Sequence, residues 1–299
     1  MRLHLAAVHS NDMHKGGRYY AALPPHAQRH RDEVKWLLES YHYFNKPEQI
    51  QRLRDSGEKV FLDSGAFSAW SQGVDIDLPG YCRFIQEYED CFTVASVLDV
   101  IGSAEGTWEN QQKMERLGTK PIPCYHYGED PRWCEYYAAN YEYMALGGFG
   151  VATRKDMREW LDEIWEKHLT DGSGRAKTKV HGFAVTAQPL MERYPWWSVD
   201  SSSWVQISSV GGIINPDYGV ISMSSTSPGR KIEGQHFNTF SGLEQIALAK
   251  HFAELGYSVD ELRDSYMSRR TYCMWGYSEM NRRLDTHGMQ YHRNQMGLF

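Results

Sequence analysis

Short apolar runs of β-type residues alternate along this chain with stretches that repeat apolar residues at helical spacing. The runs that predict strands are residues 3–8, 59–63, 92–98, 121–125, 143–146, 179–185 and 197–200. The stretches that predict helices are residues 32–43, 78–89, 104–117, 131–139, 155–168 and 188–194. This alternation indicates a parallel β/α architecture.

Seven strands, with an eighth at residues 205–209 or 220–224, favour a closed (β/α)8 barrel of the TIM type. A doubly wound dinucleotide-binding sheet would carry a Gly-x-Gly-x-x-Gly turn after its first strand, and the sequence has none there. Helical patterns return at 242–255 and 258–269. No repeat or long linker interrupts the chain, so we expect one barrel domain over residues 1–299 with a C-terminal helical extension after about residue 240.

Polar residues stand where several expected strands end. They are Asp63, Asp99, His126, the pair Gly147-Gly148, and Asp200. In barrels of this class the loops at the carboxyl ends of the strands carry the active site. The sequence therefore predicts that these side chains share one site.

Composition narrows the class of protein. With 299 residues, 41% of them hydrophobic, the chain can bury a large core, and no apolar run is long enough for a membrane helix. The first residues read as a strand and not as a signal peptide, so we expect a cytoplasmic protein with no membrane partner. The five cysteines form no Cys-x-x-Cys pair, which argues against disulfides and against a thiolate zinc site.

The net charge of −6 is unusual for a protein that binds nucleic acid, but the charge is uneven. Residues 65–150 hold 13 acidic and 5 basic side chains, whereas the remaining chain holds 25 acidic and 27 basic ones. The leading candidates for phosphate contacts are Arg269, Arg270, Arg282 and Arg283, with Tyr272, Trp275 and Tyr277 between them to stack bases. The alternative is that these arginines pair with acidic neighbours, namely Glu261, Asp264, Glu279 and Asp285.

The segment 60–70 places an acid and aromatic residues around a tight turn. Asp63 ends an apolar run, Ser-Gly follows, and Phe67 and Trp70 come next. A flat base held between aromatic rings, with a carboxylate for proton transfer, needs these groups. The alternative is a helix-capping aspartate with both aromatic residues in the core.

Three further positions suit recognition of a base. The carboxylate of Asp99 can accept two parallel hydrogen bonds, which matches the N1–H and N2–H donors of guanine. His126 can hydrogen-bond a base, and Gly147-Gly148 lets a ligand approach the backbone. Each also has a purely structural interpretation, as a loop-bound carboxylate, a locally satisfied histidine and an ordinary turn.

Asp200 follows an apolar run and lies between Trp197 and Trp204. A carboxylate there suits attack on an anomeric carbon as that carbon gains oxocarbenium character. The alternative is a capping residue in a serine-rich loop.

In their order and spacing these motifs resemble the tRNA-guanine transglycosylase superfamily, which has a (β/α)8 barrel. Residues 63–68, Asp-Ser-Gly-Ala-Phe-Ser, are similar to its Asp-Ser-Gly-Gly-Phe-Gln signature, whose aspartate transfers a proton. Residues 146–151, Leu-Gly-Gly-Phe-Gly-Val, resemble its Gly-Gly-Leu-Ala-Val loop. Asp99 looks like its base-recognising aspartate, and Asp200 falls where the family has its nucleophile. The resemblance covers residues 59–204.

The departures from the family pattern are informative. The family's zinc site needs three cysteines and a histidine after the nucleophile, but only Cys273 lies beyond Asp200. Ser68 replaces a glutamine, and His126 stands near a position where a glutamine commonly contacts the base. A compact, zinc-free chain is most similar to the phage-associated DNA branch, which exchanges guanine in DNA for a 7-deazaguanine.

The resemblance implies base exchange through a covalent Asp-glycosyl intermediate. Asp200 and Asp63 would be catalytic, and the base would be bound by Asp99, Phe67, His126, Gly147 and Gly148. The implied partners are DNA, alternatively tRNA, and a free 7-deazaguanine, in the cytoplasm of the host if the protein is phage-encoded. No metal or organic cofactor is required. The other functions left open are a tRNA-guanine transglycosylase, an N-glycosidase and a non-catalytic nucleic-acid-binding barrel.

Overall fold

The computed structural model describes residues 1–151, 153–284, 286 and 288–293. Contacts divide the chain into two compact units. The first unit consists of Met1–Asn11, Trp36–Ser201 and Leu284–Phe299, and the second of Asp12–Lys35 and Ser202–Arg283. The expectation of one domain with an extension after about residue 240 stays a prediction.

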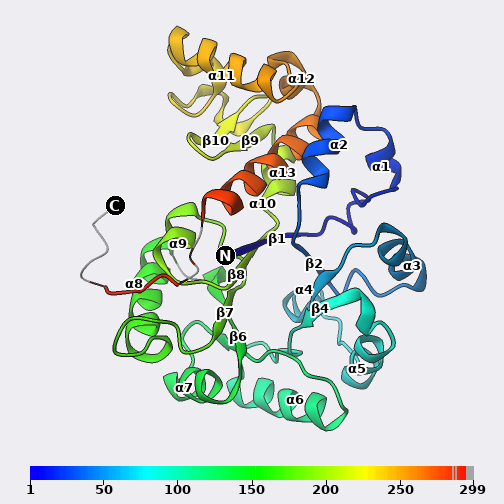
Figure 1. The fold of residues 1–299 in the computed structure, drawn as a ribbon, viewed down its shortest axis with the longest axis vertical. Coiled ribbons are helices and arrows are strands. Elements are labelled where there is room, and N and C mark those ends of the chain that lie inside the picture. The colour runs from blue at the N-terminus through cyan, green and yellow to red at the C-terminus, as the bar shows by residue number, and fades with distance from the viewer. Residues whose placement is uncertain (152, 285, 287, 294–299) are drawn as a thin grey trace. The chain divides into compact units, whose positions relative to one another are not determined.

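The first unit is built on an eight-stranded, all-parallel sheet that curls (Figure 1). Its strands are β1 (Arg2–Ala6), β2 (Leu37–Ser40), β3 (Val60–Asp63), β4 (Phe92–Ala95), β5 (Cys124–His126), β6 (Tyr143–Gly147), β7 (Lys179–Gly182) and β8 (Ser198–Ser201). They lie in the order β4-β3-β2-β1-β8-β7-β6-β5. The α/β class is confirmed, and the curled sheet is compatible with a TIM-like fold.

Hydrogen bonds also join the segments next to the two edge strands. Val97, just after β4, donates its backbone N–H to the carbonyl of Ile122 at 3.0 Å. Ile122, just before β5, donates to the carbonyl of Ala95 at 2.9 Å. The sheet therefore curls far enough for its first and last strands to meet at this point.

All seven expected strands of the sheet are present, but the eighth is not where the sequence placed it. The residues 32–43, expected as a helix, contain β2, which lies between β1 and β3. Leu37 and Leu38 are buried there, and the buried carboxylate of Glu39 accepts the backbone N–H of His9. Pairing with two neighbouring strands outweighs the helical spacing of these residues, because it buries the segment on both faces.

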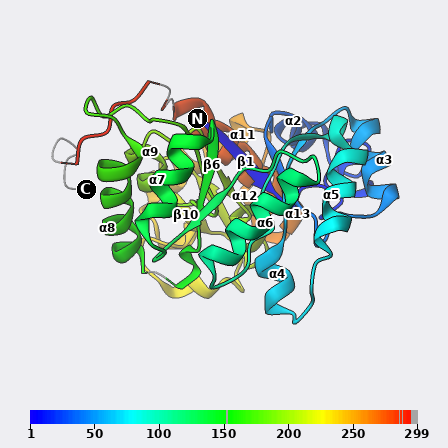
Figure 2. The same ribbon diagram turned by 90° about the horizontal axis from the view of Figure 1, so that it is seen from below.

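Helices cover the outside of the curled sheet (Figures 1 and 2). In the first unit they are α3 (Pro47–Ser56), α4 (Ala66–Ser71), α5 (Leu78–Glu87), α6 (Ala104–Arg116), α7 (Pro131–Asn140), α8 (Arg154–Ile164) and α9 (Gln188–Arg193), and a π-helical segment, Trp165–Leu169, continues α8. Side-chain oxygens of Asp77, Ser103, Asp130 and Thr153 accept backbone N–H groups in the first turns of α5 to α8. These caps satisfy donors that a helix cannot satisfy itself, and they fix where the helices begin.

Aromatic rings meet along the inner face of the curled sheet. The register of β1 with β8 sets His4 opposite Asp200. The ring of Phe61 lies 5.7 Å from that of His4 and 4.6 Å from that of His181, which is fully buried. Burial, together with the neighbouring His181, lowers the pKa of His4 to about 3, so this ring is uncharged at neutral pH.

The second unit contains a small hairpin and several helices. They are α1 (Arg18–Ala21), α2 (Pro25–Asp32), α10 (Ser203–Ser209), β9 (Gly212–Asn215), β10 (Gly219–Ser222), α11 (Gly242–Glu254), α12 (Val259–Asp264) and α13 (Tyr266–Arg283). Both sites proposed for an eighth barrel strand are therefore wrong. Residues 205–209 are helical, and residues 220–224 overlap β10, which pairs antiparallel with β9 outside the parallel sheet. Among the described residues, no helix is long and apolar enough to cross a membrane.

Candidate active site

The polar residues expected at strand ends lie at one edge of the parallel sheet. Asp63 is the last residue of β3, His126 is the last of β5, and Gly147 is the last of β6. Asp200 is the second-to-last residue of β8. Parallel strands bring their carboxyl ends to the same edge. Asp99 follows β4 and lies within ion-pairing distance of His126. The sequence thus correctly anticipated that these residues share one region.

Asp63 occupies a site that favours a proton on its carboxyl group. Its Oδ2 accepts the backbone N–H of Gly65 at 3.0 Å, and its Oδ1 lies 3.5 Å from the hydroxyl of Ser96. Although the residue keeps some exposed surface, desolvation of the carboxyl group and the charges of Asp99 and Asp200 raise the pKa of Asp63 to about 7. The group can therefore give or take a proton near neutral pH.

Gly65 makes the tight turn that follows Asp63. Its φ is +76°, and a Cβ there would collide with Ser40 Oγ and lie 2.6 Å from the Cβ of His42. Only glycine fits this backbone next to β2. The turn directs the N–H of Gly65 back to the carboxylate and starts α4 directly after it.

The carboxylate of Asp200 is held through one oxygen. Oδ1 accepts the backbone N–H of Ala184 at 2.9 Å and lies 3.3 Å from Nε2 of His181. Ala184 has a φ of +54°, a left-handed conformation that residues other than glycine rarely adopt. The turn after β7 is therefore strained where it contacts this carboxylate.

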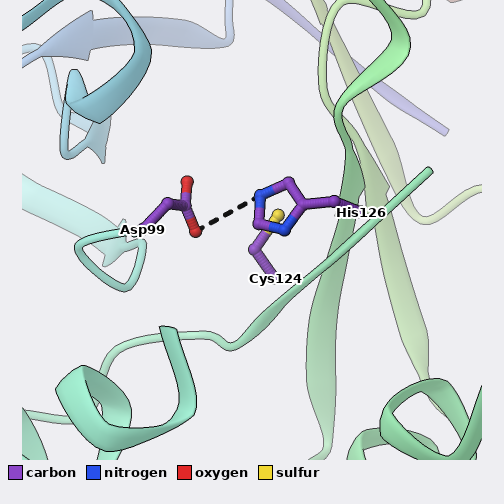
Figure 3. Close-up of side chains that lie close together, drawn as sticks. All are labelled: Asp99, Cys124 and His126. Atoms are coloured by element: carbon purple, nitrogen blue, oxygen red, sulfur yellow. Dashed lines mark ion pairs between the residues drawn. The ribbon is translucent and has the colours of Figure 1, made fainter. Parts of the chain in front are cut away.

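A second cluster joins Asp99, Cys124 and His126 (Figure 3). Nε2 of His126 lies 3.4 Å from Oδ1 of Asp99, and Nδ1 lies 3.0 Å from Oε1 of Glu129. Burial alone would lower the pKa of His126, but the adjacent Cys124 and Asp99 raise it above its ordinary value. Burial raises the pKa of the Cys124 thiol to about 12. Both ring nitrogens of His126 thus face carboxylates.

The same three residues have the chemistry of metal ligands. One ligand atom from each of Asp99, Cys124 and His126 lies within 4.8 Å of the other two, close enough to share an ion. The sequence analysis predicted no metal site and did not anticipate this group. Its signal was the Cys-x-His spacing on one strand, because alternate residues of a strand point to the same face.

The paired glycines lie against His126. A Cβ on Gly147 would lie 3.3 Å from Cys124 Sγ, and one on Gly148, whose φ is +78°, would lie 3.0 Å from the Cβ of His126. The carbonyl of Gly147 accepts the backbone N–H of Tyr127 at 2.9 Å. The glycines are therefore required to let the loop after β6 pack against the end of β5.

Phe67 and Trp70 are not core residues, so the structural interpretation of them is wrong. They lie on α4, the helix that begins three residues after Asp63, with 64% and 61% of their surfaces exposed and their ring centroids 5.9 Å apart. Exposed aromatic faces on the helix that follows Asp63 are available for stacking on a ligand.

Of the four arginines proposed to hold phosphates, the structure places Arg269 in the interior of the second unit. Arg269 is 6% exposed and donates to the carbonyls of Ser208, Leu262 and Arg263. The aromatic residues expected to stack on bases, Tyr272, Trp275 and Tyr277, are buried as well. These residues form the interior of the second unit, because α13 packs against α2, α10 and β9.

The other three arginines have partners within the second unit. Arg270 lies over the rings of Trp204 and Tyr266. Arg282 and Arg283 both pair with Glu279, as the alternative interpretation expected, and Arg283 also pairs with Asp217 at 2.6 Å. Asp285, another proposed partner, lies outside the described residues.

A cavity of about 450 Å³ lies at the opposite end of the sheet, where β6, β7 and β8 begin. Its lining includes Arg175, Lys177 and Lys179, a basic cluster, together with Trp196 and Trp197. It is separate from the carboxylates, because the two ends of a parallel strand lie at opposite edges of the sheet. We therefore place the candidate active site at the carboxylates and not in this cavity.

Comparisons with known proteins add no assignment. No protein-family model matches the chain, and a search of curated proteins finds no similar sequence. A functional assignment therefore rests on the geometry of the site and on the sequence motifs.

Proposed function

We propose that this protein is a transglycosylase that exchanges guanine in DNA for a free 7-deazaguanine base, on a closed (β/α)8 barrel. One observation carries the proposal: burial, together with the nearby charges of Asp99 and Asp200, raises the pKa of Asp63 to about 7. The site thereby places a proton carrier beside two further carboxylates, as base exchange at a sugar carbon requires. The resemblance of the motifs to the tRNA-guanine transglycosylase superfamily supports the same reaction.

In the first step Asp200 attacks C1′ of a guanosine that has been flipped out of its strand. A bond forms between a carboxylate oxygen and C1′, and the C1′–N9 bond breaks with its electron pair going to guanine. Asp63 gives its proton to the departing base. The product is a covalent glycosyl ester on Asp200.

In the second step a free 7-deazaguanine enters the space left by guanine. Its N9–H loses the proton to Asp63 while N9 attacks C1′, and the ester bond to Asp200 breaks. Two inversions at C1′ give net retention, and Asp63 regains the proton that it lost. The enzyme is thereby restored without any other reactant.

Base recognition is assigned to the cluster beside the carboxylates. Asp99 accepts the N1–H and N2–H donors of guanine, and His126, held by Glu129, lies next to it. The backbone of Gly147 and Gly148, which packs against Cys124 and His126, lies beside this cluster and is assigned to contact the base. The exposed ring of Phe67 supplies a stacking surface.

The test is exchange of radiolabelled guanine into duplex DNA and, in parallel, into a tRNA transcript, with the full-length protein. Incorporation into DNA is expected. Asp200→Asn is expected to lower the rate at least about a thousandfold, because an amide cannot act as the nucleophile. The matched control is Asp75→Asn, an exposed aspartate of the same unit, which should keep the wild-type rate. A protein–DNA adduct on a denaturing gel would report the ester directly.

The other outcomes would each replace the proposal. Incorporation only into tRNA changes the polymer, release of guanine without incorporation indicates an N-glycosidase, and binding without either indicates a non-catalytic protein. Turnover by Asp200→Asn within about tenfold of wild type, a barrier change of about 1.4 kcal/mol, would remove Asp200 as the nucleophile.

This chemistry needs no metal, so exchange should continue unchanged in a strong chelator. Glu129 lies within hydrogen-bonding distance of Nδ1 of His126 and Asp99 lies beside Nε2, so a metal bound to this ring would have to displace one of these carboxylates. Loss of activity in chelator, restored by one metal ion per chain, would instead make Asp99, Cys124 and His126 ligands of that ion.

A further inference from the structure

His181 is a buried histidine that the sequence analysis did not single out. It lies on β7, is fully buried and has the rings of Phe61 and Phe183 each 4.6 Å from its own. The ring of His4 is 5.8 Å away. A polar ring in such a cage must have partners for its nitrogens, because an unpaired buried polar group is costly.

The partners form a continuous chain that ends at Asp200. Nε2 of His181 lies 3.3 Å from Oδ1 of Asp200, and Nδ1 lies 2.6 Å from the hydroxyl of Ser198. That hydroxyl in turn lies 2.5 Å from the hydroxyl of Tyr143. The four residues come from three adjacent strands, β6, β7 and β8.

The direction of the chain follows from its ends. Oδ1 of Asp200 acts as a hydrogen-bond acceptor, so the proton between His181 and Asp200 is placed on Nε2. Burial raises the pKa of Tyr143 to about 12, so its phenol keeps a proton that it can donate to Ser198. Nδ1 then accepts from the hydroxyl of Ser198, and the proton that faces Asp200 lies on Nε2.

The hydrogen bonds to Asp200 are made to one of its two carboxylate oxygens. The N–H of Ala184 and Nε2 of His181 both converge on Oδ1. None of the residues that the structure describes donates a hydrogen bond to Oδ2. The carboxylate is thus anchored on one side and has a second oxygen to present to a substrate.

We propose that His181 is the positioning residue of the nucleophile: it fixes Oδ1 of Asp200 so that Oδ2 attacks C1′, with Tyr143 and Ser198 holding His181 in the tautomer that donates to Asp200. This inference rests on the proposed function. During attack the Oδ2–C1′ bond forms while the C1′–N9 bond breaks, and Oδ1 becomes the carbonyl oxygen of the ester. The same two donors then stabilise the carboxylate that leaves when the ester is broken.

The kinetic test compares His181→Phe with His181→Gln. Phenylalanine fills the aromatic cage but cannot donate, whereas the amide of glutamine can place an N–H near the position of Nε2. His181→Phe is expected to lower kcat about 10-fold to 100-fold with little change in KM, since one hydrogen bond to a charged group is lost. His181→Gln should recover most of that loss. His168→Gln, which changes a histidine of the same unit that pairs with Glu135, is the control and should not alter kcat.

A second measurement does not depend on activity. Nitrogen-15 NMR of histidine-labelled full-length protein should show His181, assigned by its absence in His181→Gln, as the neutral tautomer protonated on Nε2. Ser198→Ala should shift the Nδ1 resonance, and Asp200→Asn should shift the Nε2 resonance. If the protein exchanges no base, the proposed function fails, yet this spectrum still decides whether His181 is held toward Asp200. A tautomer protonated on Nδ1, or a folded His181→Phe with kcat within about twofold of wild type, overturns the positioning role.

Discussion

At the scale of single residues, Asp63 links the candidate site to the stability of the fold. A carboxyl whose pKa is higher in the folded than in the unfolded state binds its proton more tightly when folded. Its contribution to stability is therefore most favourable at low pH and declines as the pH rises from 3.8, its ordinary value, to about 7, its value here. Above that pH the folded protein holds a buried charge that the unfolded chain exposes to water.

Asp63→Asn should therefore stabilise the protein at high pH. The amide keeps an oxygen for the N–H of Gly65 but cannot ionise. In urea denaturation the variant should exceed wild type in free energy of unfolding at about pH 8, and the difference should shrink toward about pH 5. Asp75→Asn controls for the substitution itself. A difference that does not vary with pH would mean that Asp63 titrates well below neutrality.

Asp99 is predicted to set the preference for guanine. In Asp99→Asn the new amide group places a donor against one of the two donors of guanine, at a cost of about 1–3 kcal/mol. The ratio of kcat/KM for guanine to that for hypoxanthine, which lacks the 2-amino group, should fall about tenfold or more in the variant. The measurement uses one oligonucleotide with either base at the target position. An unchanged ratio would remove Asp99 from base recognition.

At the scale of elements, α13 holds the second unit together through an arginine that the sequence suggested was a phosphate ligand. Arg269 bonds three carbonyls at the ends of α10 and α12. Arg269→Met leaves these acceptors without their donor, so the free energy of unfolding should fall by more than about 2 kcal/mol. Arg282→Met, at an exposed ion pair, should cost less than about 1 kcal/mol.

The Arg269→Met variant also separates a structural role of Arg269 from a role in DNA binding. The dependence of DNA affinity on salt should be unchanged by Arg269→Met, because a buried guanidinium releases no counterion from DNA. A shallower salt dependence with unchanged stability would restore Arg269 as a phosphate ligand.

At the scale of the whole molecule, the last described residues complete the first unit, although more than eighty residues of the second unit precede them in the chain. Thr286 donates to the carbonyl of Trp196, and the buried Tyr291 donates to Asp162 at 2.7 Å. The two carboxylate oxygens of Asp162 also accept hydrogen bonds from Nε and Nη2 of Arg193. The tail thus covers a buried ion pair between α8 and the end of α9.

Tyr291→Ala is predicted to lower the free energy of unfolding by about 3–5 kcal/mol, through loss of a buried aromatic ring. It also opens the Asp162–Arg193 pair to water. Arg293→Ala removes only an exposed partner of Glu166 and should cost less than about 1 kcal/mol. Thermal and urea denaturation of both variants provide the check. Equal, small effects would show that the tail adds little to the first unit.

By itself, the sequence determined the alternation of strands and helices and the position of polar residues where strands end. Apolar periodicity reports whether a residue is buried on one face, and it was sufficient for seven strands of the sheet and for the helices α5 to α9. Because parallel strands end at one edge, it also predicted that Asp63, His126 and Asp200 would share a region. The roles of these residues in base exchange stay predictions.

Only the tertiary structure decided which distant segments become neighbours. Residues 37–40 became a strand because β1 and β3 flank them, and Arg269 became a core residue because α10 and α12 end beside it. The contact between His181 and Asp200 likewise depends on β7 lying next to β8. Hydrophobic periodicity shows that a segment is buried on one face, but not which other segment it packs against. The partner of a buried polar group is fixed only when two particular segments pack together.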